Sequence, residues 1–153
     1  MRKLLFVCLG NICRSPSAEA VFRHFVSQKG ESSFFEIDSA GTSDWHQGEA
    51  ADSRMQVHAT RRGYQLTSIS RTVNPEVDFD HFDLIVAMDR QNLKDLIAMA
   101  PKAEHLKKIV LITDFAKNIP KGVPDPYYGG DKGFEQVLDI LEVAAEGLYK
   151  SLS

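Results

Sequence analysis

The sequence predicts an α/β fold, namely an open, doubly wound sheet of four parallel strands with helices on both faces. Short apolar runs alternate along the chain with longer segments whose apolar residues recur at helical spacing, which is typical of parallel sheets. The first run, residues 4–8, is apolar at every position, as expected of a strand covered on both faces. The chain has 153 residues, 43% of them hydrophobic, with no internal repeat or linker. We therefore expect a single domain over residues 1–153.

The first half of the chain predicts a strand, a helix and a second strand. A short loop follows the first strand, and a helix is expected from about residue 14 to residue 29. Pro16 fits the first turn of that helix, and Gly30 stands where a helix C-cap is expected. A second strand is expected over residues 34–39, and Gly41 ends it.

The second half continues the alternation after a polar loop. The expected elements are, in order, a helix over residues 53–62 stopped by Gly63, a strand over 84–88, a helix capped by Asp89 and ending near Met99, a strand over 108–112, and a helix whose apolar face runs from Phe134 to Leu148.

This order implies parallel strands joined by right-handed crossovers, as in flavodoxin-like folds. In such sheets ligands bind at the carboxyl ends of the strands. The first strand ends at Cys8, so chemistry is expected there.

Composition and spacing exclude several classes of protein. A formal net charge of −3 does not indicate a nucleic-acid-binding protein, which usually carries an excess of basic residues. Neither the five histidines nor the two cysteines show metal-ligand spacing, so no metal or cofactor is expected. The apolar run from Leu4 is too short for a secretory signal or a membrane span. Two cysteines form no disulfide scaffold and suit a cytoplasmic location, while the oligomeric state stays open.

The most informative segment lies between the first strand and the first helix, where Arg14 follows Cys8 by six positions. A strand-to-helix turn directs backbone N–H groups and the positive end of the helix dipole into one concavity. Gly10 allows close approach of the backbone. Such a nest binds a tetrahedral oxyanion. The expected contacts come from the loop residues Leu9, Gly10, Asn11, Ile12, Cys13 and Ser15.

A cysteine at the base of this nest is expected to favour its thiolate, because helix N-termini and nearby cations lower the pKa of a thiol. Arg14 can offer two parallel donors to phosphate oxygens, and the Ser15 hydroxyl can donate to the sulfur. This chemistry suits covalent phosphoryl transfer through a cysteinyl-phosphate. The alternative is a structural Cys8 beside a surface Arg14.

A phosphate ester also needs a proton for its leaving oxygen, and Asp125 is the candidate acid. Pro124 and Pro126 flank it and restrict the loop, and a fixed carboxyl group beside aromatic residues suits general acid catalysis. The alternative is a plain Asp-Pro turn.

Two separated motifs resemble the low-molecular-weight protein tyrosine phosphatases. They are residues 6–16, Phe-Val-Cys-Leu-Gly-Asn-Ile-Cys-Arg-Ser-Pro, and residues 125–129, Asp-Pro-Tyr-Tyr-Gly. The resemblance extends to Asp-Ser-Ala-Gly-Thr at 38–42 and to Met-Asp-Arg-Gln-Asn-Leu at 88–93, and so spans nearly the whole chain.

The resemblance implies that Cys8 is the nucleophile, Arg14 the phosphate clamp and Asp125 the acid and then the base. It also implies that Asn11 braces the loop, that Ser15 stabilises the thiolate and that no metal is used. One position departs from the family pattern, since Ser68 stands where many members have a histidine that hydrogen-bonds the loop asparagine. The shorter serine is therefore expected to brace Asn11 less well, or through a water molecule.

Trp45, the only tryptophan, is interpreted as an aromatic wall of the substrate cleft, paired with Tyr127 or Tyr128. The alternative is a partly buried anchor for its loop. The neighbouring His46 is interpreted as solvated, and Asp89 as a helix cap without a catalytic role.

Cys13 is hypothesised to be a redox guard that forms a reversible disulfide with Cys8, because a low-pKa thiolate oxidises readily. The alternative is a small buried residue that only packs.

Three functions fit these residues, and all of them bind an oxyanion. The first is hydrolysis of phosphotyrosine in a protein or peptide. The second is arsenate reduction on the same loop, but no cysteine follows Cys13 to relay a disulfide. The third is a non-catalytic phosphotyrosine-binding module, against which Asp125 argues.

Overall fold

The computed structural model describes residues 1–127 and 130–152 and contains a four-stranded parallel sheet. The strand order is β2-β1-β3-β4. The strands are β1 (Arg2–Cys8), β2 (Phe35–Gly41), β3 (Leu84–Ala87) and β4 (Ile109–Leu111). The predicted fold class is confirmed.

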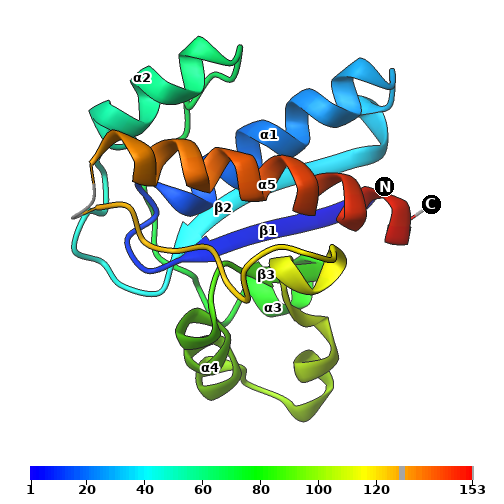
Figure 1. Cartoon of the computed structure of the whole chain (residues 1–153). Coiled ribbons are helices and arrows are strands. Elements are labelled where there is room, and N and C mark those ends of the chain that lie inside the picture. The colour runs from blue at the N-terminus through cyan, green and yellow to red at the C-terminus, as the bar shows by residue number, and fades with distance from the viewer. Residues whose placement is uncertain (128–129, 153) are drawn as a thin grey trace.

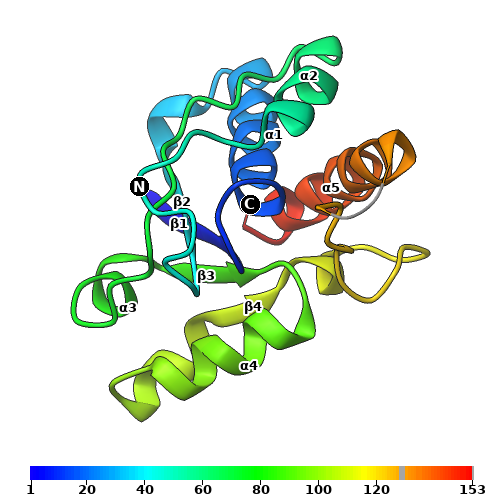
Figure 2. The same ribbon diagram turned by 90° about the vertical axis from the view of Figure 1, so that its left-hand side faces the viewer.

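Helices cover both faces of this sheet. On one face lie α1 (Arg14–Gln28) and α5 (Asp131–Leu152), with α2 (Ser53–Arg61) beside them; on the other lie α3 (Asp78–His81) and α4 (Arg90–Met99) (Figures 1 and 2). None of the described helices has the length and apolarity that a membrane span requires.

The predicted elements are confirmed with small shifts in their ends. The second strand runs two residues further than expected, to Gly41. The helix α3 and three 3₁₀ turns were not predicted; these turns are η1 (Ser32–Phe34), η2 (Ala103–Lys108) and η3 (Ile112–Phe115). Elements this short complete too few turns to show a helical repeat in the sequence.

The register of the parallel strands brings their carboxyl ends to one edge. Cys8 of β1 pairs with Gly41 of β2, while Val7 pairs with Ala87 of β3. The loops that follow these strands therefore meet at the same edge of the sheet, at the left-hand end of β1 in Figure 1.

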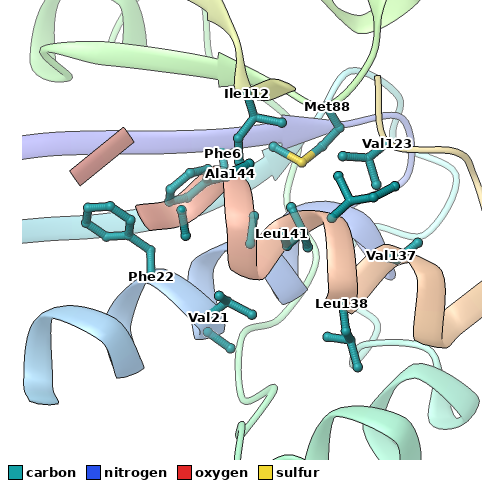
Figure 3. Close-up of a cluster of buried hydrophobic side chains, with 14 of the residues drawn as sticks. Phe6, Val21, Phe22, Met88, Ile112, Val123, Val137, Leu138, Leu141 and Ala144 are labelled. Atoms are coloured by element: carbon teal, nitrogen blue, oxygen red, sulfur yellow. The ribbon is translucent and has the colours of Figure 1, made fainter. Parts of the chain in front are cut away.

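Alternate side chains of β1 enter two separate cores, which explains the continuous apolar run. Leu4 and Phe6 join a large cluster with α1 and α5, whereas Leu5 and Val7 join a smaller cluster on the opposite face. Figure 3 shows Phe6, from β1, among side chains of the large cluster. Burial on both faces stabilises the strand that carries Cys8.

Gly147 marks the closest approach of α5 to another element. A Cβ atom at this position would lie 1.9 Å from the carbonyl oxygen of Phe115 in η3. In contrast, a Cβ at Gly133 in the same helix would lie 3.6 Å from its nearest neighbour, on Pro126.

We predict that Gly147→Ala destabilises the protein by about 1–3 kcal/mol, because α5 must move away from η3. This cost exceeds the gain of about 1 kcal/mol that alanine gives in a helix. Gly133→Ala is the matched control and is expected to be neutral or slightly stabilising. Urea unfolding of both variants measures the difference, and equal stability of the two would contradict the close contact.

Candidate active site

The loop from Leu9 to Cys13 joins the end of β1 to the start of α1 at the edge of the sheet. It forms the floor of a pocket that also receives side chains from two distant loops. The pocket is lined by Cys8, Leu9, Gly10, Ile12, Cys13, Arg14, Trp45, His46, Asp125 and Tyr127. The structure thus brings together the predicted nucleophile, clamp and acid.

The carbonyl groups of this loop point away from the pocket and are held by neighbouring segments. The acceptor–donor pairs are Cys8 O with Thr42 N (2.9 Å), Leu9 O with Ser43 N (3.0 Å), Gly10 O with Ser70 Oγ (2.9 Å) and Ile12 O with Asp52 N (2.8 Å). Because a trans peptide places its N–H opposite its C=O, outward carbonyls leave the amides turned inward. An anion-binding nest results.

The end of β2 can approach this loop because Gly41 has no side chain. A Cβ atom at Gly41 would lie only 2.7 Å from the carbonyl oxygen of Leu9. The short bonds from Thr42 and Ser43 to the loop require this approach.

Asn11 gives the loop its tight turn. Its φ of 57° lies in the left-handed region, which asparagine tolerates better than most residues. Its backbone N–H lies 3.3 Å from the Cys8 sulfur, so it can donate to a thiolate at the base of the nest.

The side chain of Asn11 is held at both ends. Its Nδ2 donates to Ser15 Oγ (2.8 Å) and Ser39 Oγ (3.0 Å), and its Oδ1 accepts from Arg71 N (3.0 Å). Ser68 lies elsewhere, in a small pocket beside α1. Three other residues supply the partners of Asn11, and the expectation of weaker bracing relative to the family stays a prediction.

The direction of these hydrogen bonds favours donation of the Ser15 hydroxyl proton to the Cys8 sulfur. Ser39 donates to the buried carboxylate of Glu19 (2.6 Å), so its oxygen is free to accept from Asn11. Ser15 also accepts from Asn11, and its hydroxyl lies 3.1 Å from Cys8 Sγ. With its oxygen already accepting from Asn11, the Ser15 hydroxyl has one proton to donate. The Cys8 sulfur, at 3.1 Å, is the nearer acceptor, and the carbonyl oxygen of Ala40 lies at 3.4 Å.

Arg14 is buried, with 3% of its side chain exposed, and it is held by three groups. It donates to Asp89 Oδ2 (2.5 Å) and Val123 O (3.1 Å), while its second terminal nitrogen lies 3.7 Å from Asp125 Oδ2. Burial opposes its charge, but the neighbouring Cys8, Asp89 and Asp125 outweigh that effect and raise the pKa of Arg14. The guanidinium is therefore a fixed cation at the nest.

Asp89 has two roles, of which the sequence predicted one. It caps α4, accepting from Asn92 N (2.7 Å) in a reciprocal capping box, as expected. Its other carboxylate oxygen binds Arg14, which the sequence did not indicate, because Asp89 follows a different strand.

Asp125 lies at the mouth of the pocket with 43% of its side chain exposed. Its Oδ1 accepts from Tyr127 N (3.0 Å) in a tight turn. The loop is anchored two residues earlier by Val123, whose N–H donates to Met88 O (2.7 Å). Asp125 therefore reaches the site from an anchored loop yet stays accessible to water.

Aromatic side chains stand over the nest. Trp45 is 73% exposed and lines the pocket, which favours the cleft wall over a buried anchor. His46 is half-buried. It lines the pocket, its ring centroid lies 6.0 Å from that of Tyr127, and its Nδ1 lies 2.7 Å from Oε2 of the exposed Glu49. Its interpretation as solvated stays a prediction. Tyr128 lies outside the described residues.

Cys13 and Cys8 are both free thiols, and both are buried. Burial, with the negative charges of Asp52, Cys8 and Asp125, raises the pKa of the Cys13 thiol well above its usual range. Cys13 is therefore a neutral thiol at physiological pH. Its role as a redox guard stays a prediction.

A possible metal site lies apart from this pocket, at Asp80, Glu104 and His105. His105 Nδ1 accepts from Lys102 N (3.2 Å), so in the neutral ring Nε2 carries the proton that faces Asp80 (2.7 Å). That nitrogen offers no lone pair to a metal, and the cluster is better explained as a structural hydrogen bond.

The chain matches one family model over residues 3–153, described as low molecular weight phosphotyrosine protein phosphatase. It is 43% identical to a low molecular weight protein-tyrosine-phosphatase of Streptomyces coelicolor, covering 98% of this chain and 93% of the relative. It is 42% identical to the human low molecular weight phosphotyrosine protein phosphatase, covering 89% and 86%. A crystal structure of a protein tyrosine phosphatase from Entamoeba histolytica superposes with a TM-score of 0.96 at 49% identity, covering 99% and 97%.

The double role of Asp89 generates a prediction. Both Asp89→Asn and Asp89→Ala remove the charge that orients Arg14, so both should lower kcat/KM for an aryl phosphate by about 10- to 100-fold. Only alanine also removes the helix cap, so Asp89→Ala should be about 1 kcal/mol less stable than Asp89→Asn. Steady-state kinetics and urea unfolding measure the two effects separately. Full activity of the Asn variant would show that Arg14 keeps its position without Asp89.

Proposed function

Because the chain belongs to the low molecular weight phosphotyrosine protein phosphatase family, we propose that it hydrolyses phosphotyrosine in proteins or peptides through a cysteinyl-phosphate. One observation carries this proposal: the sulfur of Cys8 lies at the base of a loop whose amides and arginine face the same pocket. A nucleophile inside an oxyanion nest is suited to attack on phosphorus.

In the first step the thiolate of Cys8 attacks phosphorus and forms an S–P bond. The inward amides and Arg14 stabilise the equatorial oxygens of the transition state. The bond between phosphorus and the tyrosyl oxygen breaks, and the protonated Asp125 gives its proton to the leaving phenolate.

In the second step a water molecule attacks the cysteinyl-phosphate. Asp125, now a carboxylate, accepts a proton from that water, and the S–P bond breaks to release phosphate and the thiolate. The partial exposure of Asp125 suits this step, because the attacking water must reach its carboxylate from the solvent.

The walls of the pocket favour an aromatic substrate. Trp45 and Tyr127 line it together with the apolar Ile12 of the loop itself, and aromatic pairs contribute about 0.5–1.5 kcal/mol each beyond buried area. A phenolate also leaves more readily than a serine alkoxide, because a phenol, with a pKa of about 10, is a stronger acid than an alcohol. Aryl phosphates are therefore the proposed substrate class.

Arsenate reduction and simple phosphotyrosine binding are separated from this function by one set of assays. We expect turnover of an aryl phosphate, inhibition by vanadate, and no reduction of arsenate with a small thiol as reductant. The two free cysteines also support the proposal that the protein works in a reducing, cytoplasmic compartment.

Cys8→Ser is expected to abolish turnover while inorganic phosphate still binds. The reason is that the loop amides and Arg14 hold the anion, whereas Cys8 supplies the attack. Turnover of an aryl phosphate and phosphate binding by calorimetry measure the two properties. Hydrolysis by the Ser variant at a rate near that of the wild type would exclude the covalent mechanism.

Asp125→Asn is expected to slow hydrolysis by roughly 10²–10⁴-fold, and the loss should shrink for phenols of low pKa, which leave with little help. A series of substituted phenyl phosphates measures this dependence. Asp44→Asn, an exposed aspartate in the loop that carries Trp45, is the matched control and should leave the rate unchanged. A loss that is the same for every leaving group would assign the proton donor to another group.

A further inference from the structure

Asp125 must be held at the pocket by something other than its own burial. Its side chain is 43% exposed, and its nearest contact to the nest is the 3.7 Å approach to Arg14. Tyr127, two residues further along the chain, donates its N–H to Asp125 and is therefore important for the position of the carboxylate.

Arg54, in the first turn of α2, contacts Tyr127. Its Nη2 donates one hydrogen bond to the carbonyl oxygen of Tyr127 (3.0 Å) and another to Asp52 Oδ2 (2.9 Å). Its Nε donates to Asp52 Oδ1 (3.2 Å). Asp52 is only 10% exposed and caps α2, so the guanidinium is held against a fixed carboxylate.

The guanidinium of Arg54 also contacts two aromatic rings. Its central carbon lies 5.4 Å from the ring centroid of Tyr127 and 5.0 Å from that of Phe134, distances at which a cation is attracted to the ring. Tyr127 follows Asp125 closely, and Phe134 lies in the first turn of α5. Arg54 thus ties two residues that follow Asp125 in the chain, Tyr127 and Phe134, to α2.

The same residues connect to the phosphate loop. The backbone N–H of Asp52 donates to Ile12 O (2.8 Å), and Asp52 in turn binds Arg54. A continuous set of contacts therefore runs from Ile12 through Asp52 and Arg54 to Tyr127, whose own N–H donates to Asp125 (3.0 Å).

We propose that Arg54 is a positioning residue for the general acid, which fixes Asp125 relative to the nucleophile through Tyr127. This inference rests on the proposed function. The role needs an arginine rather than any cation, because only a planar guanidinium can bind a carboxylate and a carbonyl in its plane while its faces lie near two rings.

The test uses Arg54→Gln and Arg54→Lys with aryl phosphates of graded leaving-group pKa. Both variants should lose about 10- to 100-fold in kcat for phenyl phosphate, as a misplaced group does, and much less for a nitrophenyl phosphate, whose departure needs little protonation. Phosphate inhibition should stay unchanged, because the nest and Arg14 are intact. Arg61→Gln, an exposed arginine at the end of the same helix, is the matched control and should behave as wild type.

A double variant isolates the route of the effect. If Arg54 acts through Asp125, then Arg54→Gln should add little to the loss already caused by Asp125→Asn. Additive losses, equal losses for every leaving group, full rescue by lysine, or no loss at all would each overturn the proposal. Thermal unfolding of each variant checks that the fold is kept.

Failure of the proposed function would look different. In that case the wild type would not hydrolyse aryl phosphates, or Asp125→Asn would show no dependence on the leaving group.

Discussion

The site depends on one constraint, namely that the loop between β1 and α1 keeps its amides turned into the pocket. Amides left without partners in a buried place are costly, so the loop must be held from outside. Outward hydrogen bonds to its carbonyls and the left-handed Asn11 supply this support. Because folding has already oriented these donors, little reorganisation is needed when an anion binds or charge develops.

The parallel sheet supplies the segments that hold the loop. Its register brings the residues after β2 and the residues before and after α2 to the end of β1, where Thr42, Ser43, Asp52 and Ser70 reach the loop. Burial of β1 on both faces fixes the position of Cys8 itself. The same core that stabilises the fold therefore also sets the position of the proposed nucleophile.

The catalytic groups differ in their surroundings in the way that their proposed roles require. Cys8 and Arg14 are buried, and the low dielectric of a buried site strengthens the attraction of the Arg14 cation to an anion. Asp125 is partly exposed, as a group that exchanges protons with water must be. Arg14 links the two environments, since it contacts Val123 and Asp125 of the acid loop and Asp89 of a third loop.

The sequence by itself determined the succession of strands and main helices along the chain. The spacing of apolar residues that indicates each element is a local property of the sequence. The sequence also predicted Cys8, Arg14 and Asp125 as site residues, because their chemistry is carried by short motifs, and the three residues line one pocket in the structure. It did not predict α3, which has four residues, nor the roles of Ser39, Ser70, Arg71 and Asp89 at the site. Only the tertiary structure decided these, as it decided that Ser68 does not brace Asn11. Their partners are distant in the chain, and ordinary polar residues show no pattern until folding sets the distance and direction of each hydrogen bond.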